Sequence, residues 1–215
     1  MKKIFRYNGL SLVFGSLFLI CWVFQTLTGY KENNLELEEK GVAALSVSQY
    51  LHSGHFIEST FENWESEFLQ MAMFVALSAF LFQKGSSESN DPDHQEPDES
   101  VITIKKRLPK FLQNPLGIFL YGYSLSIAFF ALFLICFILH WYGSMKDYNL
   151  EQHLKREPLA GFWKYLTNNR LWFESFQNWQ SEFLAVLCMV VLSIFLRHKG
   201  SAQSKKLTDA NSKTG

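Results

Sequence analysis

The sequence predicts an all-α membrane protein with four transmembrane helices. They form two tandem two-helix repeats related by a pseudo-two-fold axis along the membrane normal, as in parallel-repeat transporters. Three observations predict this fold: long apolar segments without charge, their recurrence at a fixed separation of 115 residues, and an unequal distribution of Lys and Arg between the segments. Together they indicate a chain that crosses a bilayer several times.

The repeat is clearest in residues 61–69, FENWESEFL, which return as residues 176–184, FQNWQSEFL. Residues 8–90 align without a gap to residues 123–205, with 31 identities in 83 pairs. Chance similarity does not keep register for that length, so the chain is a duplicated unit. A period well above about 50 residues indicates duplication of a whole structural unit, because solenoid arrays use shorter periods.

Each half contains two apolar segments of unequal length. A span needs about 20 apolar residues as a helix, and 18 or more without charge make a candidate. Residues 9–27 and 116–142 meet this criterion, whereas the charge-free runs 68–83 and 183–196 are shorter. The shorter runs span only if the Trp and Glu residues before them lie at the interface, a position that Trp favours. The predicted spans cover about residues 9–28, 66–83, 117–142 and 181–197.

The polar segments between the spans predict further helices. The first helix extends beyond the membrane to Gly41 as its C-cap, and a short helix follows around residues 47–52. A long helix then covers residues 57–83. The second half is predicted alike, with a short helix around residues 162–166 and a break at residues 168–169. The predicted domains are a first repeat at 1–84, a cytoplasmic linker at 85–115, a second repeat at 116–199 and a polar cytoplasmic tail at 200–215.

Lys-Gly-Ser follows the second apolar run of each half, at residues 84–86 and 199–201. We interpret this motif as a cytoplasmic helix stop, with Gly as the residue that ends the helix. It resembles a fragment of a phosphate loop but lacks the upstream glycine of that motif. The motifs of nucleotide-binding, zinc-protease and serine-hydrolase sites are missing too, so no cofactor and no metal site are predicted.

The linker is first acidic and then basic. Residues 88–99 carry six acids and two prolines without an apolar core residue, and we predict that they are disordered. The basic cluster before the third span predicts a lipid-surface anchor on anionic headgroups; it contains Lys105, Lys106, Arg107 and Lys110. No nucleic-acid partner is expected, because the sequence offers no folded basic face.

The orientation follows from Lys and Arg. The N-terminal head, the linker and the tail hold 13 of them, and the two loops between spans hold 7. Cytoplasmic segments are enriched in these residues, so both termini and the linker are predicted to be cytoplasmic. The three cysteines, Cys21, Cys136 and Cys188, lie within apolar runs and are interpreted as small hydrophobic residues rather than a disulfide framework.

Polar residues on the predicted spans form a candidate polar cluster. At about 100° per residue, Asn63, Glu67 and Ser78 lie within about 40° of one another, and their counterparts repeat the pattern. The pseudo-two-fold axis would bring Glu67 and Glu182 together near the bundle axis. The cluster contains Gln25, Asn63, Ser66, Glu67, Ser78, His140, Asn178, Ser181, Glu182 and Ser193.

Three functions are compatible with this cluster. In the first, its side chains join the two repeats, as Asn and Ser often do between membrane helices, and the protein has a structural or interaction role with a packed polar cap at the outer face. In the second, Glu67, Glu182 and His140 serve a small proton- or cation-coupled carrier, since ionisable groups at membrane depth are functional candidates. A membrane enzyme is the third, and the sequence shows no nucleophile–base set for it.

The chain resembles a known family in several motifs. N-G-L-S opens the first span, S-G-H-F precedes F-E-N-W-E-S-E-F-L-Q, and F-Q-N-W-Q-S-E-F-L-A-V and K-G-S follow. These resemble a family of small bacterial integral membrane proteins known only as a domain of unknown function. The resemblance covers nearly the whole chain and implies a multi-pass protein of the bacterial inner (plasma) membrane. It implies no activity and no substrate, and a protein partner or a homo-oligomer is left open.

Overall fold

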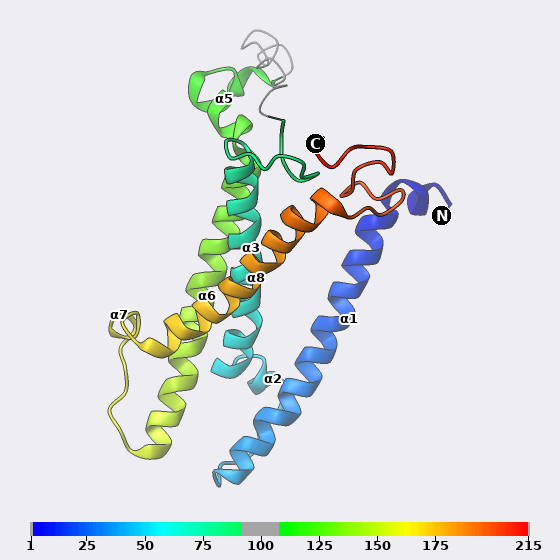
Figure 1. Cartoon of the computed structure of the whole chain (residues 1–215). Helices are drawn as coiled ribbons and strands as arrows, with labels where there is room; N and C mark the ends of the chain where they lie inside the picture. Colours follow the sequence, from blue (N-terminus) through cyan, green and yellow to red (C-terminus); the bar gives the residue numbers. More distant parts are fainter. Residues whose placement is uncertain (1, 92–107, 215) are drawn as a thin grey trace. The chain divides into compact units, whose positions relative to one another are not determined.

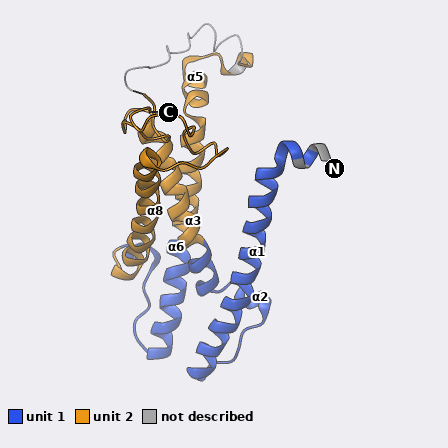
Figure 2. Cartoon of the chain, turned by 45° about the vertical axis from the view of Figure 1, so that its right-hand side comes forward, with its two compact units in different colours: residues 1–60, 139–166 blue, residues 61–138, 167–215 orange. Residues whose placement is uncertain are grey.

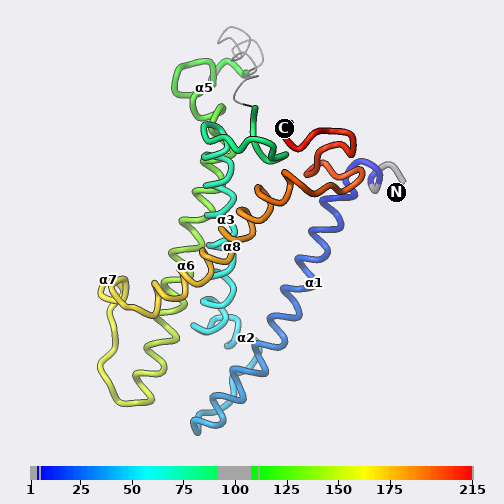
Figure 3. Tube along the Cα trace, in the orientation of Figure 1, coloured from blue at the N-terminus to red at the C-terminus, as the bar shows by residue number. Residues whose placement is uncertain are grey.

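The computed structural model describes residues 2–91 and 108–214, and in these two stretches every regular element is helical. The predicted all-α class is therefore confirmed for the described chain. Figures 1 and 3 show the course of the helices. They are α1 (Lys2–Glu39), α2 (Val47–Tyr50), α3 (Gly54–Ser78), the 3-10 helix η1 (Lys110–Leu112), α5 (Pro115–Gly122), α6 (Ser124–Lys155), α7 (Phe162–Tyr165) and α8 (Asn169–Phe195).

Three helices among the described residues are long and apolar enough to cross a membrane: Arg6–Glu39, Ser124–Lys155 and Asn169–Phe195. Only 0%, 17% and 6% of their most apolar windows are buried inside the protein, so these side chains require a lipid environment. The three helices therefore indicate a membrane protein.

The second predicted span, residues 66–83, differs from the structure because α3 ends at Ser78. Downstream side chains supply alternative hydrogen bonds to the backbone there. Ser89 Oγ accepts from the Gln83 N–H at 2.9 Å, and Asn90 Nδ2 donates to the Ser78 carbonyl at 3.5 Å. The chain therefore folds back on itself where the apolar pattern alone predicts continued helix.

The third predicted span, residues 117–142, is also not one continuous helix. It consists of the end of α5 and the start of α6, with Tyr123 (φ −107°, ψ 12°) between them. Asn8, its counterpart 115 residues earlier, has a similar non-helical conformation within α1 (φ −126°, ψ 15°). The same local kink therefore precedes the long apolar helix in each half.

The two Lys-Gly-Ser segments are turns rather than helix stops, because α3 and α8 have already ended. The Ser86 N–H donates to the Gln83 carbonyl at 3.1 Å, and the Ser201 N–H donates to the His198 carbonyl at 3.2 Å. The third residue of each turn is glycine with positive φ, 85° in the first and 84° in the second. That position requires glycine in a type II turn.

The two long helices α1 and α6 end with matching caps. The predicted cap at Gly41 is confirmed: its φ is 72°, and the Val42 N–H donates to the Leu37 carbonyl at 2.8 Å. This six-residue closure is the Schellman motif. Arg156 takes the same left-handed conformation after α6 (φ 59°), and the next N–H closes the same bond at 2.9 Å.

An asparagine on α1 and another on α6 each bind the loop that follows the helix. Asn34 Nδ2 donates to the Leu45 carbonyl at 3.0 Å and its Oδ1 accepts from the Leu45 N–H at 2.8 Å. Asn149 makes the same pair with Ala160 at 2.9 and 2.8 Å. Both clamps place a short helix, α2 or α7, at a fixed distance from the helix end.

The chain forms two compact units, one of residues 1–60 and 139–166, the other of residues 61–138 and 167–215 (Figure 2). In unit 1 the backbones of α3 and α6 touch at two glycines. A Cβ on Gly54 would lie 2.8 Å from the Gly143 carbonyl oxygen, and a Cβ on Gly143 would lie 2.9 Å from the Ile57 carbonyl carbon. These distances exclude a larger residue, as in membrane-helix crossings built on small residues.

Buried tyrosines of α2 and α7 anchor the short helices in unit 1. Tyr50 and Tyr165 are each 1% exposed. The Tyr165 hydroxyl lies 2.9 Å from Ser144 Oγ on α6. The counterpart of Ser144 is Gly29 on α1, which has no side chain and lies directly against the Tyr50 hydroxyl.

In unit 2 the segment after α8 folds back onto the loop after α3. The Thr214 hydroxyl accepts from the Gly85 N–H at 2.9 Å. Lys205 Nζ donates to the carbonyls of Gly85, Asn211 and Lys213, the latter two at 3.1 Å. The ammonium group thereby satisfies several backbone oxygens at once.

Candidate functional site

The shared F-x-N-W motif has the same local geometry in both copies. On α3 the rings of Phe61 and Trp64 meet edge to face with centroids 5.2 Å apart, and on α8 Phe176 and Trp179 do so at 5.3 Å. Residues three apart on a helix face the same side, which brings the two rings together.

Trp179 is held by aromatic residues and hydrogen-bonded to a carboxylate. Its ring lies 6.2 Å from Phe133 and 6.5 Å from Trp172 between centroids. Its Nε1–H donates to Glu65 Oε1 at 2.9 Å, and Glu65 is 0% exposed. A buried carboxylate requires such donors, because burial without partners is costly. This bond therefore joins α3 to α8 inside unit 2.

A second bond between the same helices lies one turn away. Asn178 Nδ2 donates to Glu62 Oε1 and also to the Glu174 carbonyl of its own helix, the latter at 3.3 Å. Glu62 and Glu65 are one helical turn apart on α3, and their partners are adjacent residues of α8. The two bonds form a polar seam, by which we mean Glu62, Glu65, Asn178 and Trp179.

The predicted serines bond to their own helices. Ser66 Oγ donates to the Asn63 carbonyl and Ser181 Oγ to the Asn178 carbonyl, both at 2.8 Å. Ser66 is 2% exposed, so this internal bond satisfies a buried hydroxyl. The Ser66 hydroxyl therefore does not need a partner on another helix.

The predicted carboxylate pair, Glu67 and Glu182, is not part of the polar seam. Glu67 is exposed and Glu182 is half-buried. Asn63 of the same predicted cluster is exposed on α3.

Four residues of the predicted cluster remain: Gln25, Ser78, His140 and Ser193. Gln25 Nε2 donates to the Ser59 carbonyl at 3.1 Å in unit 1, where His140 is also located and is 0% exposed. Ser78 Oγ donates to the Val75 carbonyl at 3.3 Å. Ser193 Oγ lies 2.9 Å from Ser86 Oγ in the turn after α3. Gln25 and His140 thus belong to unit 1, and the other eight residues of the predicted cluster belong to unit 2.

The model of one protein family matches the chain over residues 1–215. The chain belongs to DUF6766, a domain of unknown function. No curated protein and no solved structure matches it significantly. Membership of DUF6766 therefore assigns no chemistry, and the geometry of this chain has to support any functional proposal.

Three residues of the polar seam were not part of the predicted polar cluster: Glu62, Glu65 and Trp179. Trp179 has an identical counterpart in Trp64, whereas Glu62 and Glu65 correspond to Gln177 and Gln180. The signal that could have found them is this difference: within an otherwise matched motif, acids in one copy replace amides in the other. Such a difference marks positions at which the two copies make different contacts, as Glu65 does with Trp179.

Of the predicted lipid-surface anchor, Lys105, Lys106 and Arg107 lie outside the described residues of this DUF6766 chain. Lys110 is exposed and begins η1. Within the part of the chain that the structure describes, no group of three or more His, Cys, Asp or Glu could hold a metal ion. The polar seam is a set of hydrogen bonds between α3 and α8.

Proposed function

We propose that this DUF6766 chain is a structural or interaction protein of the bacterial inner membrane, whose duplicated motif joins its helices. The observation that carries this proposal is the hydrogen bond from Trp179 to the fully buried Glu65. The motif residues are used to connect α3 with α8, and a buried bonded carboxylate is not free to bind a transported ion.

The proposed architecture has four spans in two tandem repeats, with a pseudo-two-fold axis along the membrane normal. The recurrence of kinks, caps, clamps and turns at a separation of 115 residues supports it. In this arrangement both termini and the linker are cytoplasmic, and the basic residues before the third span contact anionic headgroups. The loops of unit 1 then form a packed polar cap at the outer face, where a protein partner or a second copy would bind.

A second candidate function is a small proton- or cation-coupled carrier. The observation that favours it is that Glu67 and Glu182 stand on the two helices that the polar seam joins, and that neither carboxylate is fully buried. Two carboxylates in one region of the protein suit a site that holds a proton or a cation. The exposure of Glu67 gives such an ion access to the pair.

A double-mutant cycle tests the structural proposal. Glu65→Gln, Trp179→Phe and the double variant are compared by reversible unfolding in detergent. Because the bond involves a charged acceptor in a buried site, we expect a coupling energy of about 1–2 kcal/mol. Gln at position 65 reproduces the residue of the other copy and keeps the side-chain volume, which makes it a conservative partner for the cycle.

Glu67→Gln combined with Glu182→Gln separates the two functions. The structural proposal expects this variant to fold and to show the same proton and cation flux as the wild type in proteoliposomes. A flux that the wild type supports and that this folded variant loses would favour the carrier instead. A coupling energy near zero for Glu65 and Trp179 would argue against the structural proposal independently.

A further inference from the structure

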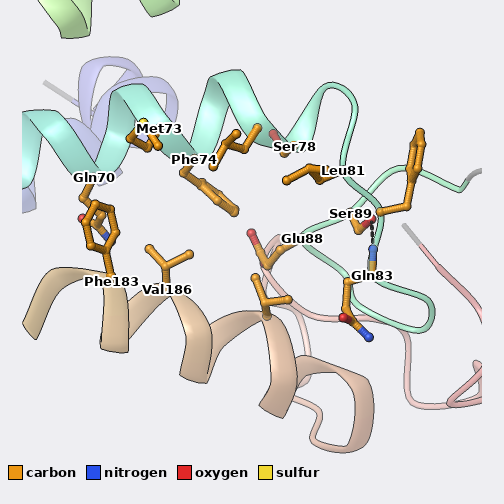
Figure 4. A pocket seen from close by; sticks show the side chains of 13 residues that line it. Gln70, Met73, Phe74, Ser78, Leu81, Gln83, Glu88, Ser89, Phe183 and Val186 are labelled. Carbon is orange, nitrogen blue, oxygen red and sulfur yellow. Dashed lines mark hydrogen bonds between the residues drawn. The ribbon is translucent and has the colours of Figure 1, made fainter. Parts of the chain in front are cut away.

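A cavity of about 290 Å³ lies between α3 and α8 in unit 2, at the end of these helices remote from the polar seam. Figure 4 shows Met73 and Phe74 on one side and Phe183 and Val186 on the other. Its volume is just below the range of about 300–1,000 Å³ typical of small-molecule sites. It has room for a slender molecule, and a helix of about 10 Å diameter does not fit.

The walls of this cavity continue onto a surface that requires lipid. Phe183 on the apolar helix α8 is 41% exposed, and Leu81 and Met73 are 56% and 39% exposed. Because α8 is long and apolar enough to cross a membrane, we expect hydrocarbon chains around Phe183 and around the apolar side chains beside it. An occupant of the cavity therefore enters from the bilayer.

The cavity has one polar end, formed by the loop after α3. The Glu88 carboxylate extends between the two helices (Figure 4) and lines the cavity together with Gln83 and Ser89. Ser87 Oγ donates to Glu88 Oε1 at 3.3 Å, and the Gln203 amide nitrogen lies 3.0 Å from both carboxylate oxygens when oriented to donate. These neutral donors orient the carboxylate without cancelling its charge.

We propose that this cavity binds one acyl chain of a bilayer lipid whose headgroup presents a primary ammonium to Glu88. The apolar walls match the chain, the exposed Phe183 and Leu81 give access from the bilayer, and the carboxylate complements a cation. An anionic headgroup meets repulsion at Glu88, so the site selects an amine-bearing lipid. The proposal does not depend on the structural role of the polar seam.

The test uses the full chain in vesicles that contain equal amounts of phosphatidylethanolamine and phosphatidylglycerol. One lipid at a time carries the same photoreactive acyl chain, and crosslinked peptides are mapped by mass spectrometry. We expect crosslinks on α3 and α8 around the cavity, with about tenfold more from the ethanolamine lipid, as a charge-assisted hydrogen bond provides.

Three variants locate the site. Val186→Trp fills the cavity and should lower the crosslinking several-fold, whereas Val191→Trp, on an exposed position of α8 outside the cavity, should not. Glu88→Gln keeps the shape and should reduce the preference between headgroups to about equal, since the Coulomb attraction is lost. Size-exclusion profiles of the same samples identify any variant that fails to fold.

Competition with the wild type provides a result that depends on no variant. Excess unlabelled phosphatidylethanolamine should displace the photoreactive lipid, and excess phosphatidylglycerol should not. Equal displacement by both lipids, equal crosslinking of the two tryptophan variants, or an unchanged preference in Glu88→Gln would overturn the proposal. A labelling pattern spread over all apolar helices would show ordinary bilayer contact instead.

Discussion

At the scale of single residues, Gly54 and Gly143 determine how closely two helices approach. Their Cα hydrogens occupy space in which a methyl group would lie under 3.0 Å from backbone atoms of the facing helix. Backbone cannot move aside as a flexible side chain does, so the contact tolerates no larger residue. The position of α3 against α6 in unit 1 thus depends on two glycines.

Replacing Gly143 by Ala should therefore destabilise the protein by about 1–3 kcal/mol, the usual cost of overpacking. The measurement is thermal or denaturant unfolding in detergent. Gly15→Ala is the matched control, because a Cβ there meets nothing within 4 Å and alanine favours the helix. A Gly143→Ala protein as stable as the Gly15→Ala protein would refute the close backbone contact.

Tyr50 gives a pH-dependent prediction. Burial raises the pKa of Tyr50 to about 12, and its hydroxyl lies 3.3 Å from His55 Nδ1. A raised pKa in the folded state means that stability is complete below the unfolded value of about 10 and is lost as pH rises toward 12. Stability should decline between about pH 10 and 12.

The control for this pH dependence is Tyr50→Phe, because other tyrosines and lysines titrate in the same range. The unfolding free energy of Tyr50→Phe should fall less steeply above about pH 10 than that of the wild type. Identical slopes for the two proteins would show that Tyr50 ionises as easily in the folded state as in the unfolded one.

At the scale of elements, the two Schellman caps form a natural comparison. Gly41 adopts positive φ without cost, whereas Arg156 has a side chain in the same conformation. A non-glycine residue there costs about 1 kcal/mol. Arg156→Gly should thus stabilise the protein by about 1 kcal/mol, and Gly41→Ala should destabilise it by a similar amount.

Equilibrium unfolding of both cap variants measures this difference, and Arg156→Ala serves as the control for the loss of the charged side chain. If Arg156→Gly and Arg156→Ala have equal stability, the left-handed conformation at this position carries no strain.

The end of a helix was predictable where the residue that stops it lies next to the helix in the sequence. The sequence places the end of α1 at a glycine, and the cap at Gly41 is confirmed. The end of α3 was not predictable in this way, because its alternative partners, Ser89 and Asn90, come from eleven and twelve residues further along the chain. The apolar pattern of residues 79–83 continues although the helix does not, so the apolar run alone gives the wrong boundary.

The candidate site was predictable only in part for a related reason. A repeat identifies residues that both copies keep, and Asn178 is one of them. Its partner Glu62 and the neighbouring Glu65 differ between the copies, so a search for shared residues passes over them. Which carboxylate of α3 is buried, as Glu65 is, and which is exposed, as Glu67 is, depends on packing against α8, and sequence periodicity does not contain that information.

At the scale of the whole molecule, the four-span proposal makes a prediction about sidedness. Single cysteines at Ala44, Trp163 and Lys199, all exposed positions, are tested with a membrane-impermeant maleimide. Four spans place Ala44→Cys and Trp163→Cys on the outer side and Lys199→Cys in the cytoplasm. If α3 does not cross, Trp163→Cys lies on the side opposite to Ala44→Cys.

The wild type is the control, since Cys21 and Cys188 are exposed on the protein surface and within apolar helices. Hydrocarbon around them should exclude the charged reagent. Labelling of Ala44→Cys from the cytoplasmic side would reverse the proposed orientation, and strong labelling of the wild type would contradict the membrane assignment of α1 or α8.

The polar seam has a consequence for the history of the chain. A single-repeat ancestor that formed a symmetric dimer would have presented the same residue types from both subunits, either two carboxylates or two amides. A single polypeptide has no such restriction, and the first copy carries Glu62 and Glu65 where the second carries Gln177 and Gln180. Neither half could therefore replace the other: two first halves would bring four acids together, and two second halves would lack the anion that Trp179 binds.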